Sequence, residues 1–269
     1  MQPLRTPVAI LAIWLGAGWL TGAGASITQG SSTARQYQFE SRIEDGPGDL
    51  HGSTVGRITV MREGDRRAVY AEDTPLQPGC GSIPAVTVIS EHLAVLCGNL
   101  GGRHNTYKVF RHSGAALDVT TLDIGDGNSA LETGNDGQLL GLVMRRDLFP
   151  QLTGPRYFPL VYGLHDDAIT FGFRPVFSAA AAPLYLRYYQ SLKQESEASH
   201  GAEEMLAMLL AMQNSALTCK ELAYLEKRLV KGGKFQQHKA ARTFLMEWAQ
   251  KLPAIGYPVF NNVTCKGTQ

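Results

Sequence analysis

The first half of the chain alternates apolar and polar residues over short runs, as strands with one buried face do. Ten such runs lie between Gln36 and Phe177, and they are rich in valine, threonine and aromatic residues. They cover residues 36–43, 56–63, 66–72, 85–90, 92–98, 106–112, 116–123, 138–146, 158–165 and 168–175. Turn-forming segments such as HSG at His112 and GNDG at Gly134 separate several of them. Because helical crossovers are missing, we expect an antiparallel β-meander folded as a sandwich, a barrel or a propeller-like stack.

The periodicity becomes helical in the last third. Residues 202–213, AEEMLAMLLAMQ, are apolar around most of a helical circumference, which predicts a helix buried on several sides. Thr218 followed by Glu221 matches a capping box and predicts a helix start, and Gly232 predicts its end. A further helix is expected from about Lys234 to Leu252.

The predicted fold class is therefore α+β, with a small C-terminal helical bundle after the β-meander. We predict an antiparallel β-rich domain over residues 26–178, a connecting segment over 179–200, and a helical domain with a disulfide-tied tail over 201–269. Within the connecting segment, residues 183–192 suit either a short helix opened by Pro183 or a strand.

The first 25 residues have the pattern of a cleaved secretory signal peptide. Arg5 precedes an apolar run from Val8 to Leu20, and the small residues of Ala23–Ala25 suit signal peptidase. The run is short for a membrane-spanning helix, although an uncleaved anchor is the alternative. We expect a soluble, exported protein, periplasmic or extracellular, without stable membrane insertion after cleavage.

Charge and cysteine content refine this expectation. Without Arg5, the 25 Lys and Arg residues become 24 and balance the 24 Asp and Glu residues. This neutrality disfavours nucleic acid as a partner. The four cysteines, in an oxidising compartment, predict two disulfides. Proximity favours Cys80–Cys97 and Cys219–Cys265, and a zinc site is disfavoured because no CxxC spacing occurs.

The densest chemical cluster is GNLGGRHN, which precedes the run TYKVF. Arg103 could bind a carboxylate or phosphate, His104 could act as a base near neutral pH, and Asn105 adds hydrogen-bonding groups. The alternative is a wide glycine turn between two strands. We predict Arg103, His104 and Asn105 as a binding surface.

Two further polar segments are candidate sites. Asp123, Asp126 and Asn128 offer oxygen ligands for calcium, but their spacing does not fit an EF-hand, and such residues are also typical of hairpin loops. His165 lies in an HDD segment that could supply part of a hydrolytic site or form a hairpin tip. The chain has no GxSxG or HExxH motif and no Walker or GxGxxG unit, so no cofactor is expected.

Two functions are consistent with these observations. The first is a non-enzymatic binding or protective module, resembling an inhibitor or immunity protein, that acts on a protein partner in the cell envelope or outside the cell. The second is an exported hydrolase with Arg103, His104 and His165 in one pocket, which requires these side chains to converge. A weaker third hypothesis is a small-ligand binder with a cavity in the β-domain.

Overall fold

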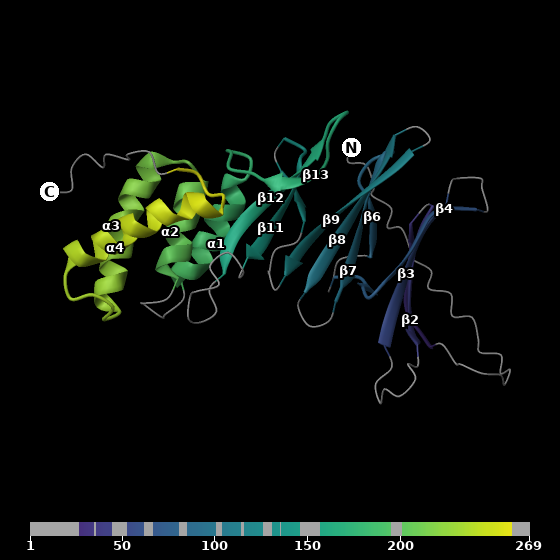
Figure 1. The fold of residues 1–269 in the computed structure, drawn as a ribbon, viewed down its shortest axis with the longest axis horizontal. Helices are drawn as coiled ribbons and strands as arrows, with labels where there is room; N and C mark the ends of the chain where they lie inside the picture. Colours follow the sequence, from purple (N-terminus) through teal and green to yellow (C-terminus); the bar gives the residue numbers. More distant parts are fainter. Residues whose placement is uncertain are drawn as a thin grey trace, which may run out of the picture.

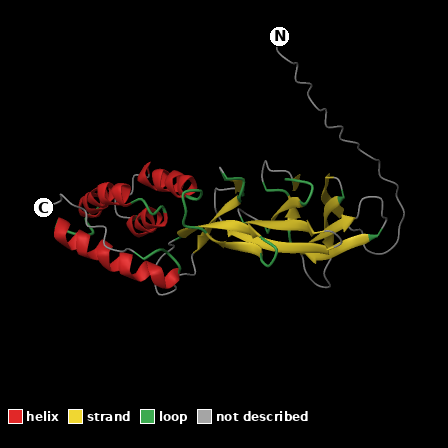
Figure 2. Cartoon of the chain, turned by 90° about the horizontal axis from the view of Figure 1, so that it is seen from above, coloured by secondary structure: helices red, strands yellow, loops and turns green. Residues whose placement is uncertain are grey.

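The fold is a stack of three antiparallel sheets followed by a layer of helices (Figures 1 and 2). It was obtained as a computed structural model. The structure describes residues 27–34, 36–44, 53–61, 67–80, 85–100, 104–113, 116–125, 131–134, 136–145, 157–194 and 201–259. Figure 1 shows the helices at one end, and the sheets follow one another toward the other end in reverse chain order.

Each sheet is built from strands that are consecutive along the chain. Sheet I contains β1 (Ile27–Ala34), β2 (Tyr37–Glu44), β3 (Ser53–Met61) and β4 (Ala68–Thr74), in that order. Sheet II contains β5 (Gln77–Pro78), β6 (Val86–Val88), β7 (Leu93–Asn99), β8 (Asn105–Ser113) and β9 (Ala116–Gly125), with β5 and β6 both paired to β7. Sheet III contains β10 (Glu132–Thr133), β11 (Leu139–Arg145), β12 (Phe158–Asp166) and β13 (Phe171–Pro175). Each of the three sheets is therefore a separate antiparallel meander.

Sheet II lies between the other two sheets and is buried on both faces. Phe110 on β8 belongs to the apolar core shared with sheet I, whereas its neighbour Val109 belongs to the core shared with sheet III. Leu96 and Val95 on β7 divide in the same way. Successive side chains of a strand point to opposite faces, so a strand in a middle layer needs apolar residues at consecutive positions.

Four helices cover the outer face of sheet III. They are α1 (Ala182–Gln194), α2 (Ala202–Ala211), α3 (Ser215–Lys231) and α4 (His238–Lys251), followed by a 3-10 turn at Leu252–Ile255. Every residue of α2 is buried, as its apolar circumference predicts. Leu140 and Leu142 of β11 and Val161 of β12 belong to the same core as the helices.

The start of α3 differs from the prediction. The N-cap is Asn214, whose side chain accepts a hydrogen bond from the Leu217 backbone N–H at 3.1 Å. Thr218 is already inside the helix, where its hydroxyl donates to the Asn214 carbonyl at 2.8 Å. The capping-box prediction was wrong because asparagine, also a strong N-cap, stands four residues earlier.

The α+β fold, with antiparallel sheets before a helical bundle, is confirmed. Residues 183–192 are helical, which decides between the two alternatives for that segment. The predicted signal peptide, residues 1–25, lies outside the described residues. None of the helices in the described part of the chain is long and apolar enough to span a membrane. The division into a 26–178 and a 201–269 domain stays a prediction.

Candidate functional site

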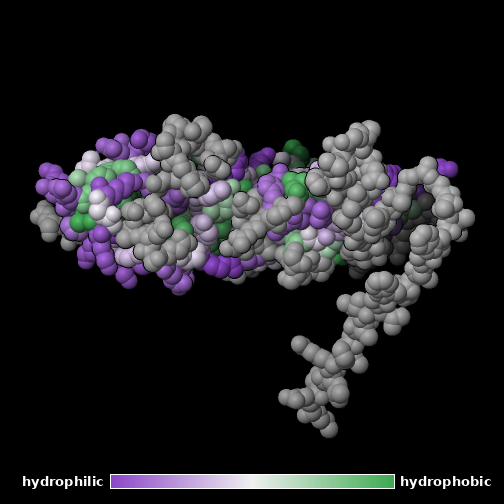
Figure 3. Space-filling view, turned by 90° about the horizontal axis from the view of Figure 1, so that it is seen from below, coloured by the Kyte–Doolittle hydropathy of each residue, from purple (hydrophilic) through white to green (hydrophobic). Residues whose placement is uncertain are grey.

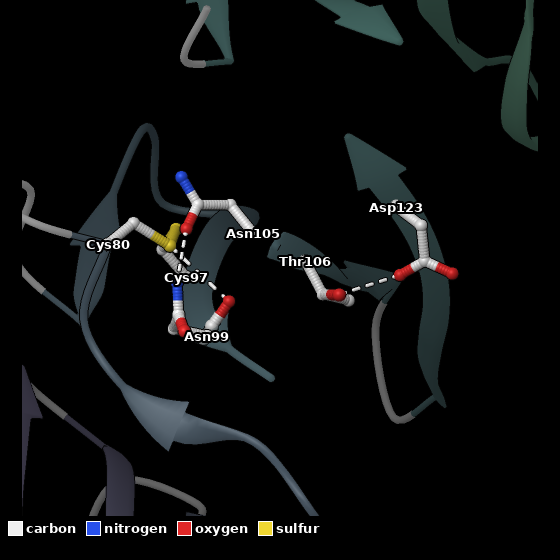
Figure 4. Close-up of a disulfide and its surroundings, with 7 residues drawn as sticks. Cys80, Cys97, Asn99, Asn105, Thr106 and Asp123 are labelled. Atoms are coloured by element: carbon white, nitrogen blue, oxygen red, sulfur yellow. Dashed lines mark hydrogen bonds between the residues drawn. A yellow bond between two sulfur atoms is a disulfide. The ribbon is translucent and has the colours of Figure 1, made fainter. Parts of the chain in front are cut away.

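A disulfide anchors one end of sheet II. Cys80 and Cys97 are bonded, with their Cα atoms 5.8 Å apart, which confirms the predicted pairing (Figure 4). The backbone N–H of Gly79 donates to the Cys97 carbonyl at 2.9 Å, and the Cys97 N–H donates to the Ala85 carbonyl at 2.7 Å. The segment that contains Cys80, between β5 and β6, is thus fixed to the edge of β7 by one covalent link and two hydrogen bonds.

The turn from β7 to β8 continues from this anchor. The Leu100 N–H donates to the His104 carbonyl at 3.0 Å, which closes the turn. The Asn99 side-chain amide donates to the Asn105 side-chain oxygen at 2.8 Å, directly across the two strands (Figure 4). Leu100 projects from this fixed frame with 46% of its surface exposed, and His104 is half-buried beside it.

Glycine is required where β7 passes β5. A Cβ atom at Gly98 would lie 2.8 Å from the Leu76 Cβ atom, closer than real side chains approach. The glycine therefore allows the approach of the Leu76–Gln77 segment to β7, one residue before Asn99. The packing of Leu76 against Gly98 thus holds the end of β7 in place, in addition to the disulfide.

Of the calcium candidates, Asp123 lies at this same end. Its carboxylate accepts a hydrogen bond from the Thr106 hydroxyl at 2.7 Å across β8 and β9 (Figure 4). Asp126 and Asn128 lie outside the described residues. In the described ranges, no group of His, Cys, Asp and Glu side chains is arranged to hold a metal ion.

Two more predicted positions fall outside the described residues, Arg103 and Cys265. Cys219 is disulfide-bonded, as expected, but its predicted pairing with Cys265 stays a prediction.

His165 lies at the opposite end of the strands from His104. It precedes the last residue of β12, Asp166, whose carboxylate accepts from Arg111 at 2.7 Å. Arg111 is near the end of β8, and at about 3.3 Å per residue the strand from Asn105 to Arg111 spans about 20 Å. The structure therefore does not bring the two histidines together. The hydrolase hypothesis needs both in one pocket, so this geometry gives it no support.

The HDD segment forms a hairpin tip, as one interpretation of the sequence predicted. The Asp167 carboxylate accepts backbone hydrogen bonds from Ile169 at 2.9 Å and Thr170 at 2.6 Å. These two N–H groups hold the pKa of Asp167 below its ordinary value, Thr170 contributing more. This turn is an Asx-type turn, so its acidic residues have a structural role.

Arg111 joins sheets II and III at this second end. Its guanidinium contacts the carboxylates of Asp118 at 2.8 Å and Asp166 at 2.7 Å, and it lies 4.5 Å from the centre of the Phe171 ring. Hydrogen bonds to Asp166 and Asp118 raise the pKa of Arg111 above its already high ordinary value, so the side chain is always charged.

On the other face of β8, Lys108 joins sheet II to sheet I. Its ammonium donates to both carboxylate oxygens of Glu72 on β4, at 2.8 and 2.7 Å, and Tyr70 donates to the same carboxylate. Burial acts to raise the pKa of Glu72, but the hydrogen bonds from Lys108 and Tyr70 and the charge of Lys108 outweigh it and lower that pKa. β8 thus carries one ionic link to each neighbouring sheet.

A second polar contact between sheets I and II involves His112. Its Nε2 atom lies 2.6 Å from the Tyr37 hydroxyl and 2.9 Å from the Gln36 side-chain nitrogen. Burial, with a smaller effect from the charge of His92, lowers the pKa of His112. Sequence reasoning missed Lys108, Arg111 and His112, because a polar residue inside an alternating run is normally read as solvent-facing.

The comparisons with known proteins found no match among family models, curated proteins or solved structures. The function has therefore to be argued from the geometry alone. The end of sheet II beside the disulfide presents the polar side chains of His104 and Asn105 next to the exposed Leu100. This combination suits binding to a protein surface.

Proposed function

We propose that this protein is an exported, non-enzymatic binding module for another protein, and that the β7–β8 turn is its contact surface. The surface consists of Leu100, His104 and Asn105, with Arg103 between them in the sequence. The observation that carries the proposal is the anchoring of this turn by the Cys80–Cys97 disulfide and the Asn99–Asn105 hydrogen bond.

The hydrogen bonds between Asn99 and Asn105 and between Leu100 and His104 support a binding role, because groups already ordered before association lose little entropy when they bind. Leu100 supplies an apolar contact, and His104 and Asn105 supply polar groups at its edge, an arrangement typical of a small contact centre. On the face shown in Figure 3, hydrophilic and hydrophobic residues are interspersed over the parts not drawn in grey.

A protective role outside the cytoplasm is part of the same proposal. Disulfides persist in oxidising compartments, and the Cys80–Cys97 disulfide lies next to the contact surface, two residues before Asn99 on β7. A module of this kind would occlude an enzyme or toxin of the envelope by placing Leu100 and its polar neighbours against it. Binding would then depend on oxidation, since reduction removes the covalent link between the Cys80 segment and β7.

Site-specific photo-crosslinking in the native compartment tests the proposal. A photoreactive amino acid at position 100 should give one discrete adduct with a protein partner. The matched control is position 169, because Ile169 is also an apolar residue of an exposed turn, 97% exposed, at the opposite end of the strands. The adduct from position 100 should disappear when Asn105→Ala removes the side-chain contact to Asn99.

Two results would contradict the proposal. Equal adducts from positions 100 and 169 would show nonspecific contact, and the absence of an adduct at position 100 in the oxidised protein would exclude the turn as the binding surface.

A further inference from the structure

We infer that the cleft between β10, β11 and α1 is a binding site for a small apolar α-amino acid in its zwitterionic form. The cleft lies in sheet III and the helical layer, not at the β7–β8 turn. The inference therefore goes beyond the proposed function and does not depend on it.

The cleft has an apolar floor and a charged mouth. Leu140 of β11 and Leu184 of α1 are almost fully buried at the floor, and Ala180 and Pro183 complete the apolar wall. At the mouth, the Arg187 guanidinium contacts the Glu132 carboxylate at 2.8 Å.

Local structure brings the two charges to one place. Glu132 pairs directly with Leu140 across β10 and β11, and side chains of paired residues lie on the same face of a sheet. Arg187 follows Pro183 and Leu184 by four and three residues on α1, so the three share one helix face. The cation and the anion thus lie over the same apolar floor, one from each layer.

The volume of the cleft matches one small side chain. It is about 150 Å³, close to the size of an apolar protein cavity that accepts a benzene molecule. The isobutyl group of leucine is smaller than benzene and fits such a space. Larger ligands, which occupy pockets of about 300 Å³ or more, do not.

The ion pair at the mouth is available for exchange. The side chains of Arg187 and Glu132 are 59% and 41% exposed, so their contact in solvent contributes little to stability. A ligand carboxylate can bind the planar guanidinium of Arg187 through two hydrogen bonds, and a ligand ammonium can donate to Glu132. An amino acid carries both groups on one carbon beside its side chain, so it satisfies both charges while its apolar group enters the cleft.

The test is an NMR titration of the full chain, with its disulfides intact, using L-leucine as the probe. We expect saturable shifts in the backbone signals of residues 131–140 and 180–187. 4-Methylpentanoate, which lacks only the ammonium group, and isopentylamine, which lacks only the carboxylate, should each bind at least tenfold more weakly.

Variants assign the groups. Arg187→Ala and Glu132→Gln should each raise the dissociation constant for L-leucine at least tenfold, and both positions are exposed enough to leave folding intact. Ala180→Leu should abolish binding by filling the cleft while keeping the ion pair. Lys227→Ala, which removes an exposed cation from α3, should change nothing.

Some results would overturn the inference. If no backbone signal shows a saturable shift up to about 10 mM L-leucine, the dissociation constant lies above that concentration and the site is excluded. Binding that is unchanged in Arg187→Ala or Glu132→Gln would show that the charges do not recognise the ligand. Neither result bears on crosslinking from position 100, so the two proposals fail separately.

Discussion

The helical layer and the sheet stack are stabilised in different ways. Around α2 the helices and sheet III share one large continuous apolar core, which includes every residue of α2 except Glu203 and Glu204. The two cores between the sheets are smaller, with ten buried apolar residues each among those described. The structure adds a disulfide within sheet II, two ionic links between the sheets and a half-buried histidine contact.

The difference follows from geometry. A buried helix presents apolar side chains in all directions, so one element can join several neighbours. A sheet offers alternate residues to each face, and a short strand contributes only a few side chains to each interface. The stack therefore depends more on specific polar and covalent links, whereas the helical layer depends on burial. The four predictions below test this contrast.

The largest effect is expected in the helical core. Leu225 on α3 is fully buried, so Leu225→Ala should lower the free energy of unfolding by about 2–5 kcal/mol. Denaturant unfolding followed by tryptophan fluorescence measures this directly, because Trp248 on α4 is the only tryptophan after residue 25. Leu100→Ala is the exposed control and should change stability by less than about 0.5 kcal/mol. Equal effects at the two positions would contradict the importance of burial here.

Removing the disulfide should act mainly on the other region. Cys80 and Cys97 are 17 residues apart in the sequence, and a loop of this length corresponds to about 3 kcal/mol of stabilisation. In the double variant C80A/C97A, the β-sheet circular-dichroism transition should move to lower denaturant. The Trp248 fluorescence transition should move less, since Trp248 lies in the helical core.

A common shift of both transitions in C80A/C97A would contradict the separation of the two regions. It would show that the sheets and helices unfold as one cooperative unit, through the core they share at sheet III.

The ionic link between sheets I and II should have an intermediate effect. Lys108→Met leaves the Glu72 carboxylate near the interface without its cation, at a cost of about 1–3 kcal/mol. Adding Glu72→Gln should recover part of this loss, because the uncompensated charge is then gone. Thermal or denaturant unfolding of the two variants and the parent measures the recovery. A double variant no more stable than Lys108→Met alone would show that packing of the lysine, not charge, matters.

Acid titration sharpens this prediction. Because the pKa of Glu72 is lowered in the folded state, the Lys108–Glu72 ion pair contributes fully to folding stability above the ordinary glutamate pKa of 4.5. That contribution is lost as the pH falls through the folded-state pKa. In the variant that combines Lys108→Met with Glu72→Gln, this part of the loss of stability in acid should be absent.

The sequence predicts the strands better than their layers. The β7 run LAVLC is apolar at consecutive positions, which is consistent with burial on both faces, but it does not reveal which sheet covers each face. β1 was missed because ITQGSSTA is almost entirely polar and its pairing with β2 depends on tertiary context. The Cys80–Cys97 disulfide could be predicted because the two cysteines are close in the sequence and an oxidising compartment was expected. The cleft at Arg187 and Glu132 could not be predicted, because its two charges are 55 residues apart and meet only after α1 packs on sheet III.

The smallest effect on the free energy of unfolding is expected for His112→Gln. This variant tests a polar contact between sheets I and II while the Cys80–Cys97 disulfide stays intact. Burial lowers the pKa of His112, so near neutral pH the imidazole is uncharged in both folded and unfolded chains. As the pH falls through the ordinary value of 6.5, the unfolded chain takes up the proton first, and folded-state stability decreases until the folded-state pKa is reached. His112→Gln should remove this part of the pH dependence, which begins as the pH falls below about 7. His238→Gln, at an exposed position on α4, should leave it unchanged. Free energies of unfolding measured across this range for both variants decide the question, and a slope retained in His112→Gln would assign the pH dependence to other groups.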